Sequence, residues 1–170
     1  MTLTAKKYCV GVSFGFIECF NDAIYSSNMV IDDNGEIVDV FRRVSPGWKE
    51  PIANLMYKEG NGFHIFNYKG KNIGVSICGD LWYDVFLKEL ETIKMDVLLW
   101  PVYIDYSLEE WETEQNEYAN RVKVLNYPIL MINSYVDDIE RANGGSYVFD
   151  EGEIKASLKM GNIGVLKFEL

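Results

Sequence analysis

Apolar residues along this chain follow two spacings, one typical of β-strands and one typical of helices. Residues 7–20, 24–32 and 36–41 are rich in Val, Ile, Phe and Tyr in short runs that predict strands. Between the second and third runs lies Asn34-Gly35, a strong signal for a tight hairpin turn. The first quarter of the chain therefore predicts an antiparallel set of strands.

The next segment, residues 45–62, contains two of the four prolines and has little periodicity. Such a stretch predicts a long loop, and long ordered loops are often functional. Residues 63–68 and 73–77 then resume the strand pattern on either side of a glycine-containing turn, which predicts a second hairpin.

From Asp80 the spacing becomes helical. Apolar residues recur every three or four positions, at Leu81, Trp82, Val85, Phe86, Leu90 and Ile93. Residues 95–104 are almost continuously apolar, which is typical of a strand in a sheet covered on both faces.

Ser107 and Glu110 have the spacing of a capping box, so a second helix is expected from there to about residue 126. Three segments with strand patterns follow it: 127–135, a hairpin over 143–158, and a last strand over 161–170. The order of elements predicts an α/β fold with mixed sheets and two main helices in a single domain, residues 1–170.

Composition excludes several classes of function. The chain has 26 acidic and 16 basic residues and a formal charge of −10, which disfavours binding to nucleic acid or to an anionic membrane. No apolar run approaches the ~20 residues of a membrane span. Three cysteines and one histidine, without metal-ligand spacing or a phosphate-binding loop, predict no disulfide framework, no metal and no cofactor. Reduced cysteines predict a cytoplasmic protein.

Cys78 is the main candidate for chemistry, because it lies where a predicted strand hands over to a helix. At such a bend the sulfur is exposed above the sheet and the following N–H groups point at whatever the sulfur attacks. Gly79 would allow the sharp turn. The alternatives are core packing or, less favoured, redox sensing. Cys9 and Cys19 are interpreted as structural, and His64 as an ordinary strand residue.

Four stretches, in order, resemble the nitrilase superfamily, the carbon–nitrogen hydrolases. The segment around the cysteine is KNIGVSICGDLWYDVFLKELETIKMDVLLWPVY. The other three are YSSNMVIDDNGEIVDVFRR, NEYANRVKVLNYPILMINSY and GGSYVFDEGEIKA. The resemblance covers the chain from about Lys7 and implies an α-β-β-α sandwich that commonly forms dimers or larger assemblies.

The resemblance also implies a Glu–Lys–Cys triad that hydrolyses a small amide or nitrile through a cysteine thioester, without a cofactor. Cys78 matches the nucleophile and Gly79 the oxyanion-binding N–H. Arg43 stands at the position that matches the family's catalytic lysine and keeps the positive charge. Lys49, in the following loop, is an alternative cation. Glu50 lies near the position of a substrate-positioning glutamate.

A pocket around Cys78 is expected to include Trp48, Trp82 and Tyr103, although such aromatics are more often part of a core. In that case the partner is a small-molecule amide or nitrile.

The catalytic glutamate of the family lies in a Pro-Glu motif that this chain lacks. Glu18 matches a different, non-catalytic glutamate. We therefore expect an N-terminally shortened, incomplete domain, which is either a truncated amidase or an inactive member that serves as a binding or assembly module. Because shortening would expose apolar sheet surface, we also predict a homodimer.

Overall fold

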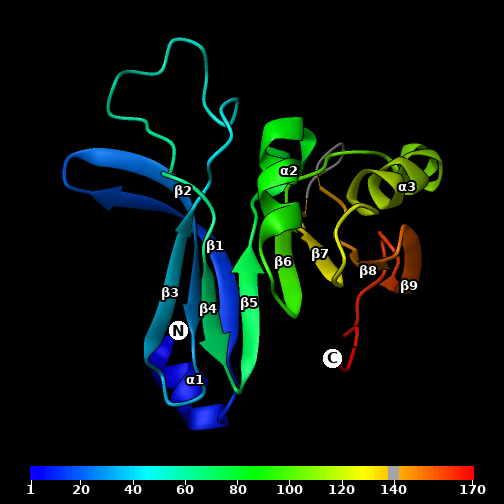
Figure 1. Cartoon of the computed structure of the whole chain (residues 1–170), viewed down its shortest axis with the longest axis horizontal. Helices are drawn as coiled ribbons and strands as arrows, with labels where there is room; N and C mark the ends of the chain where they lie inside the picture. The colour runs from blue at the N-terminus through cyan, green and yellow to red at the C-terminus, as the bar shows by residue number, and fades with distance from the viewer. Residues whose placement is uncertain (138–141) are drawn as a thin grey trace.

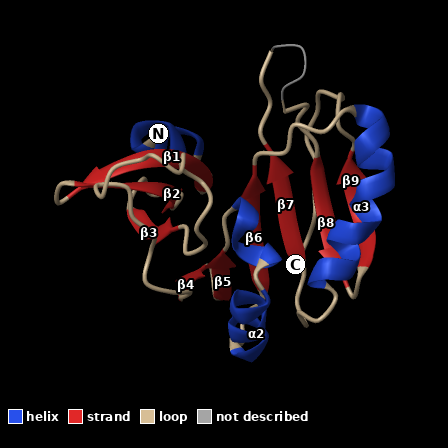
Figure 2. Cartoon of the chain, turned by 90° about the horizontal axis from the view of Figure 1, so that it is seen from above, coloured by secondary structure: helices blue, strands red, loops and turns tan. Residues whose placement is uncertain are grey.

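The structure, a computed structural model, describes residues 1–137 and 142–170. Two β-sheets pack against each other, and two helices cover the outer face of the larger sheet (Figures 1 and 2). The α/β fold with mixed sheets and two main helices is confirmed.

The smaller sheet is antiparallel and has the order β1-β2-β3 among the described residues. Its strands are β1 (Val12–Phe20), β2 (Ala23–Ile31) and β3 (Ile37–Arg42). A short helix, α1 (Thr2–Tyr8), packs against the β2–β3 turn, where Gly35 has φ 85° and a Cβ would lie 2.7 Å from the carbonyl oxygen of Thr2. Glycine at this turn thus serves both the hairpin and the docking of α1.

The larger sheet has the order β4-β5-β6-β7-β8-β9, in which β5, β6 and β7 are parallel to one another. Its strands are β4 (Ile65–Tyr68), β5 (Lys71–Val75), β6 (Val97–Val102), β7 (Ile129–Asn133), β8 (Ser146–Asp150) and β9 (Glu153–Leu158). The crossover from β5 to β6 contains a 3₁₀ turn, η1 (Cys78–Trp82), and α2 (Asp84–Thr92), and the crossover from β6 to β7 contains α3 (Leu108–Val122).

The expected capping box starts α3. The Ser107 hydroxyl accepts a hydrogen bond of 3.2 Å from the Glu110 N–H, and the Glu110 carboxylate accepts one of 2.7 Å from the Ser107 N–H. The helical pattern that begins at Asp80, in contrast, forms α2 only from Asp84, because η1 takes the first turn.

The prediction of a last strand over 161–170 is wrong. Residues 159–170 are all described and contain no strand, and Ile163 and Val165 are 99% and 82% exposed. The segment has a strand-like pattern, but a strand also needs a neighbouring backbone with which to pair. Here it finds none within the described residues.

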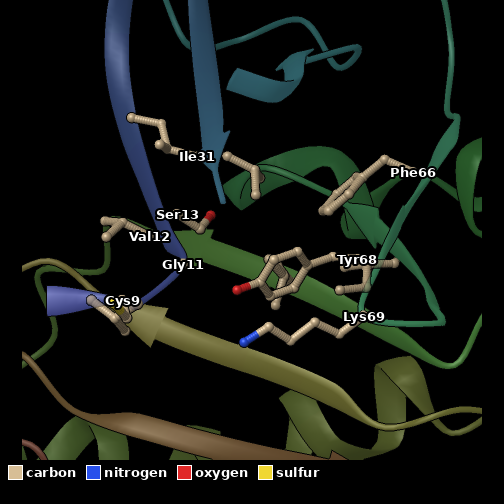
Figure 3. A pocket seen from close by; sticks show the side chains of 12 residues that line it. Cys9, Gly11, Val12, Ser13, Ile31, Phe66, Tyr68 and Lys69 are labelled. Atoms are coloured by element: carbon tan, nitrogen blue, oxygen red, sulfur yellow. The ribbon is translucent and has the colours of Figure 1, made fainter. Parts of the chain in front are cut away.

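Two apolar cores lie on the two faces of the larger sheet. One joins α2 and α3 to β6, β7 and β8, with Trp100 and Trp111 at its centre. The other lies between the two sheets and includes Phe41 and Val75. Beside it is a cavity of about 360 Å³ with mainly apolar walls from β1, β2 and β4 to β6 (Figure 3).

Candidate active site

Cys78 occupies the sharp bend that follows β5. Its φ is 47°, in the left-handed region that non-glycine residues rarely adopt, and such strain is found at functional sites as well as at tight turns such as those at Asn21 and Lys69. Its carbonyl oxygen accepts a hydrogen bond of 2.9 Å from the indole Nε1 of Trp100 in β6. The half-buried thiol lies 3.8 Å from the Tyr103 carbonyl oxygen. The bend therefore holds the sulfur at the carboxyl ends of two parallel strands, where α/β folds commonly place their sites.

Asp80 fixes this bend from the inside. The residue is 0% exposed, and its Oδ2 accepts a hydrogen bond of 2.8 Å from the Ile77 N–H. Its Oδ1 accepts hydrogen bonds from the N–H groups of Val44, at 3.2 Å, and Ser45, at 2.7 Å. Burial raises the pKa of Asp80, and the N–H donors oppose that rise. One carboxyl group thus joins the bend to the segment after β3.

Arg43 lies directly over Gly79. Its Nη2 occupies the space that a Cβ on residue 79 would need, which explains the glycine. The Arg43 Nε donates a hydrogen bond of 2.8 Å to the Ser45 hydroxyl and lies 4.0 Å from Oδ1 of Asp80, and the side chain is only 11% exposed. The structure therefore places a fixed positive charge against the backbone that follows Cys78.

A thiol, the backbone N–H after it and a fixed cation are the groups that thiolate attack and stabilisation of an oxyanion require. The structure brings three sequence-predicted residues together in this way: Cys78, Gly79 and Arg43. They come from two segments that follow different sheets, so the site lies at the junction of the two sheets.

The long loop contributes three predicted residues that do not join this group. Lys49 donates a hydrogen bond of 2.7 Å to the Tyr57 carbonyl and pairs with Glu59 at 3.0 Å, and Trp48 packs on the Tyr57 ring. Glu50 is exposed. Within residues 1–137 and 142–170, no hydrogen bond or ion pair connects the three to the Cys78 bend.

Trp82 and Tyr103 have different relations to Cys78. Tyr103 approaches the thiol through its backbone carbonyl, and its ring is partly exposed. The Trp82 ring packs edge-on against Tyr118 of α3, with 4.9 Å between ring centroids, and Arg121 lies 5.9 Å from it. Trp82 therefore anchors the bend to α3.

The remaining chemically reactive side chains lie elsewhere. Cys9 and Cys19 are both exposed, so their proposed structural role does not come from burial in the core. His64 is about half exposed and lies with its Nε2 2.7 Å from Oδ1 of Asp39.

Glu18 pairs with Arg42 through two contacts of 2.7 Å and accepts a third hydrogen bond of 2.7 Å from Ser27. The Arg42 guanidinium also lies against the rings of Phe20 and Tyr25, at 4.6 and 4.3 Å. Hydrogen bonds from Arg42 hold the pKa of Glu18 below its usual value. These contacts stabilise the smaller sheet.

Two residues at the site, Asp80 and Ser45, were not predicted from the sequence. Asp80 had a detectable signal, because an acidic residue in the first turn of a helix commonly accepts backbone hydrogen bonds there. Its bonds to residues 44 and 45 cross from one segment to another, and only the tertiary structure reveals them.

The family model for carbon-nitrogen hydrolase matches residues 1–170. The chain belongs to the carbon-nitrogen hydrolase family. Among curated proteins, it is 28% identical to a citrullinase from Francisella tularensis over 166 residues, which cover 87% of this chain and 56% of that protein. It is 27% identical to an N-carbamoylputrescine amidase from Arabidopsis thaliana over 127 residues, 72% of this chain and 42% of that protein. The chain therefore spans about half the length of these curated relatives.

Solved structures show the same fold. A carbon-nitrogen hydrolase from Helicobacter pylori superposes with a TM-score of 0.74 at 18% identity, over 93% of this chain and 61% of that one. An amidase of the nitrilase superfamily from Nesterenkonia superposes with a TM-score of 0.76 at 14% identity, over 94% and 61%. The nitrilase-like fold expected for this member of the family is thus confirmed. Among its described residues, no helix is long and apolar enough to cross a membrane.

Proposed function

We propose that this carbon-nitrogen hydrolase attacks a small amide or nitrile with the Cys78 thiolate. The observation that carries the proposal is the strained bend at Cys78 with the Arg43 guanidinium over Gly79. Two of the relatives are named for substrates that carry a carbamoyl group, citrulline and N-carbamoylputrescine. A carbamoyl amide is therefore the first substrate class to test.

With an amide, the Cys78 sulfur adds to the carbonyl carbon, and the π-electron pair of the C=O bond moves to the oxygen. The Gly79 N–H and Arg43 would stabilise this oxyanion. Collapse breaks the carbon–nitrogen bond, and the nitrogen leaves as ammonia or an amine after it receives a proton. Water then adds to the thioester, and the acid is released while the thiolate is restored.

Proton transfer needs a general acid and base. The resemblance implies a glutamate in a Pro-Glu motif, which this sequence lacks. The absence of such a group would reduce the rate by about 10²–10⁴. The arginine in the place of the family's lysine favours a second candidate, a binding or assembly module that has kept the Cys78 site without turnover.

Competitive alkylation tests the nucleophile. Iodoacetamide at neutral pH, with peptide mass spectrometry, gives the rate at each cysteine. We expect Cys78 to react fastest although Cys9 and Cys19 are more exposed. Ammonia release from citrulline and N-carbamoylputrescine, with Cys78→Ser as the control, then tests turnover.

Fast alkylation with turnover supports the hydrolase, and fast alkylation without turnover supports the binding module. If Cys78 reacts more slowly than both exposed thiols, the proposal that Cys78 is the nucleophile is wrong.

Association into a dimer stays a prediction, as do a cytoplasmic location and the lack of a cofactor. The dimer is supported by the apolar cavity between the sheets and by β1, which lies at an edge of the smaller sheet. Light scattering at micromolar concentration measures the mass, and a monomer there would contradict it.

A further inference from the structure

Asp80 is the most completely buried charged group near the candidate active site. Its carboxylate accepts hydrogen bonds from three backbone N–H groups, and these belong to two distant segments, residues 44–45 and residue 77. Two of them, from Val44 and Ser45, immediately follow Arg43. The third, from Ile77, immediately precedes Cys78. The same carboxyl group therefore sets the position of the cation's backbone relative to the thiol's backbone.

Ser45 completes the connection. Its N–H is held by Asp80 at 2.7 Å, and its hydroxyl accepts a hydrogen bond of 2.8 Å from the Arg43 Nε. Ser45 is itself fully buried. The Arg43 guanidinium is thus held by a residue that Asp80 holds, and it fills the space above Gly79 that the missing Cβ leaves open.

We propose that Asp80 is a positioning residue, which keeps the Arg43 guanidinium over Gly79 and beside Cys78. This inference rests on the proposed function, because it explains how the cation is kept at the reacting centre. Asp80 does not touch the substrate in this scheme. It acts through Ser45 and Arg43, and an error of about 1 Å in such a placement can cost ~10²-fold in rate.

If Asp80 acts by holding Arg43 in position, its loss should slow the alkylation of Cys78. If it acts only through its charge, its loss should speed that alkylation, so the inference is testable. In Asp80→Asn the amide can accept hydrogen bonds on one side only, so either the Ile77 N–H or the pair from Val44 and Ser45 loses its acceptor. If position matters, Arg43 moves away and Cys78 alkylates more slowly. If only charge matters, loss of a negative group beside Cys78 favours the thiolate and alkylation becomes faster.

The experiment measures alkylation of Cys78 by iodoacetamide from pH 6 to 9 and amide hydrogen exchange in the same proteins. For Asp80→Asn we expect the rate at pH 7 to fall by about tenfold, within the ~10²-fold that a misplaced group can cost. We also expect faster exchange at the Ile77, Val44 and Ser45 amides. An unchanged or higher rate of alkylation would overturn the positioning role.

Two more variants separate positioning from a loss of folding. Ser45→Ala keeps the backbone bonds to Asp80 but removes the hydrogen bond from the Arg43 Nε and leaves only the one to the Pro46 carbonyl, so we expect slower alkylation with unchanged amide exchange at residue 77. Asp32→Asn is the matched control, because the Asp32 carboxylate also accepts hydrogen bonds from backbone N–H groups, of Asn34 at 2.9 Å and Glu36 at 2.8 Å, but in the β2–β3 turn. It should leave the alkylation of Cys78 unchanged, and an equal fall in this control would contradict the proposal.

Failure of the proposed function gives a different result. In that case wild-type Cys78 is not faster than the exposed cysteines, whereas Asp80→Asn still loosens the three amides. If wild-type Cys78 is fast and Asp80→Asn leaves both its rate and the exchange unchanged, the proposed function stands and the positioning role fails.

Discussion

Arg42 and Arg43 are neighbours in the chain, but they serve two different regions of the molecule. Arg42 ends β3, where it makes a bidentate pair with Glu18 and packs against two aromatic rings of the smaller sheet. Arg43 turns to the junction of the sheets, where its two hydrogen bonds go to the uncharged oxygens of Ser45 and Pro46. The first charge pairs with its carboxylate at 2.7 Å, whereas the second lies over Gly79 and stays 4.0 Å from the Asp80 carboxylate.

The two carboxylates nearest these arginines differ in the same way. Glu18 meets its arginine at 2.7 Å, and the pairing lowers its pKa. Asp80 stays 4.0 Å from Arg43 and gives its oxygens to backbone N–H groups, while burial raises its pKa. The comparison teaches that a carboxylate in close contact with an arginine ties two strands of one sheet together, whereas a carboxylate bound to backbone N–H groups joins two distant segments and stays farther from its cation.

The largest expected effect comes from removing the second charge. Arg43→Met should slow any ammonia release by about 10²–10³, the cost of losing one oxyanion donor. It should also slow the alkylation of Cys78, because a nearby cation favours the thiolate. Arg43→Lys should retain part of the wild-type rate, because the positive charge remains while the planar set of guanidinium N–H donors is lost. Rates per cysteine from mass spectrometry check this.

Two matched variants sharpen the result. Arg42→Met should leave Cys78 reactivity unchanged, because Arg42 belongs to the smaller sheet. Lys49→Ala should do the same, because Lys49 is bound to Glu59 and Tyr57 in the loop. If Lys49→Ala slows Cys78 and Arg43→Met does not, the cation at the site is Lys49.

A smaller effect, on stability alone, is expected at the Glu18 pair. Glu18→Gln should lower the free energy of unfolding by about 1.5–3 kcal/mol, the range for hydrogen bonds to charged groups, without a change in Cys78 reactivity. Urea unfolding at pH 7 gives the difference. A change in reactivity as large as that of Arg43→Met would show that the two regions are not independent.

The same variant has a pH signature. The pKa of Glu18 is lower in the folded state than in the unfolded chain, so its contribution is complete above the unfolded value, about 4.3, and is lost as the pH falls through the folded value. Wild-type stability should therefore fall more steeply below pH 4.3 than that of Glu18→Gln. Parallel curves for the two proteins would contradict this.

Much of the fold could be predicted because its signals are local. The hairpin at Asn34-Gly35, the capping box at Ser107 and the apolar run of β6 each depend on residues close in the chain. The last strand failed for the opposite reason. Residues 161–170 have a strand pattern, but no strand of the described chain pairs with them.

In the candidate site, too, the residues that are close in the chain were predictable and the contacts between distant segments were not. The bend at Cys78 and Gly79 was predictable, because both residues belong to one strand-to-helix transition. The proximity of Arg43 depended on the resemblance to a family, and the role of Asp80 was not predicted, because its partners lie 35 and 36 residues away. Cys9 and Cys19, which lie in or beside apolar runs, are nevertheless exposed, and the local pattern does not reveal this.

The sequence by itself determined where the chain turns, where helices begin and where a thiol follows a strand, because these depend on backbone preferences over a few residues. Only the tertiary structure decided which of two adjacent arginines pairs with Glu18 and which lies over Gly79. That choice is made by Glu18 on one side and by Asp80, Ser45 and Gly79 on the other. Packing brings these residues together from distant segments, and no local preference encodes their distances.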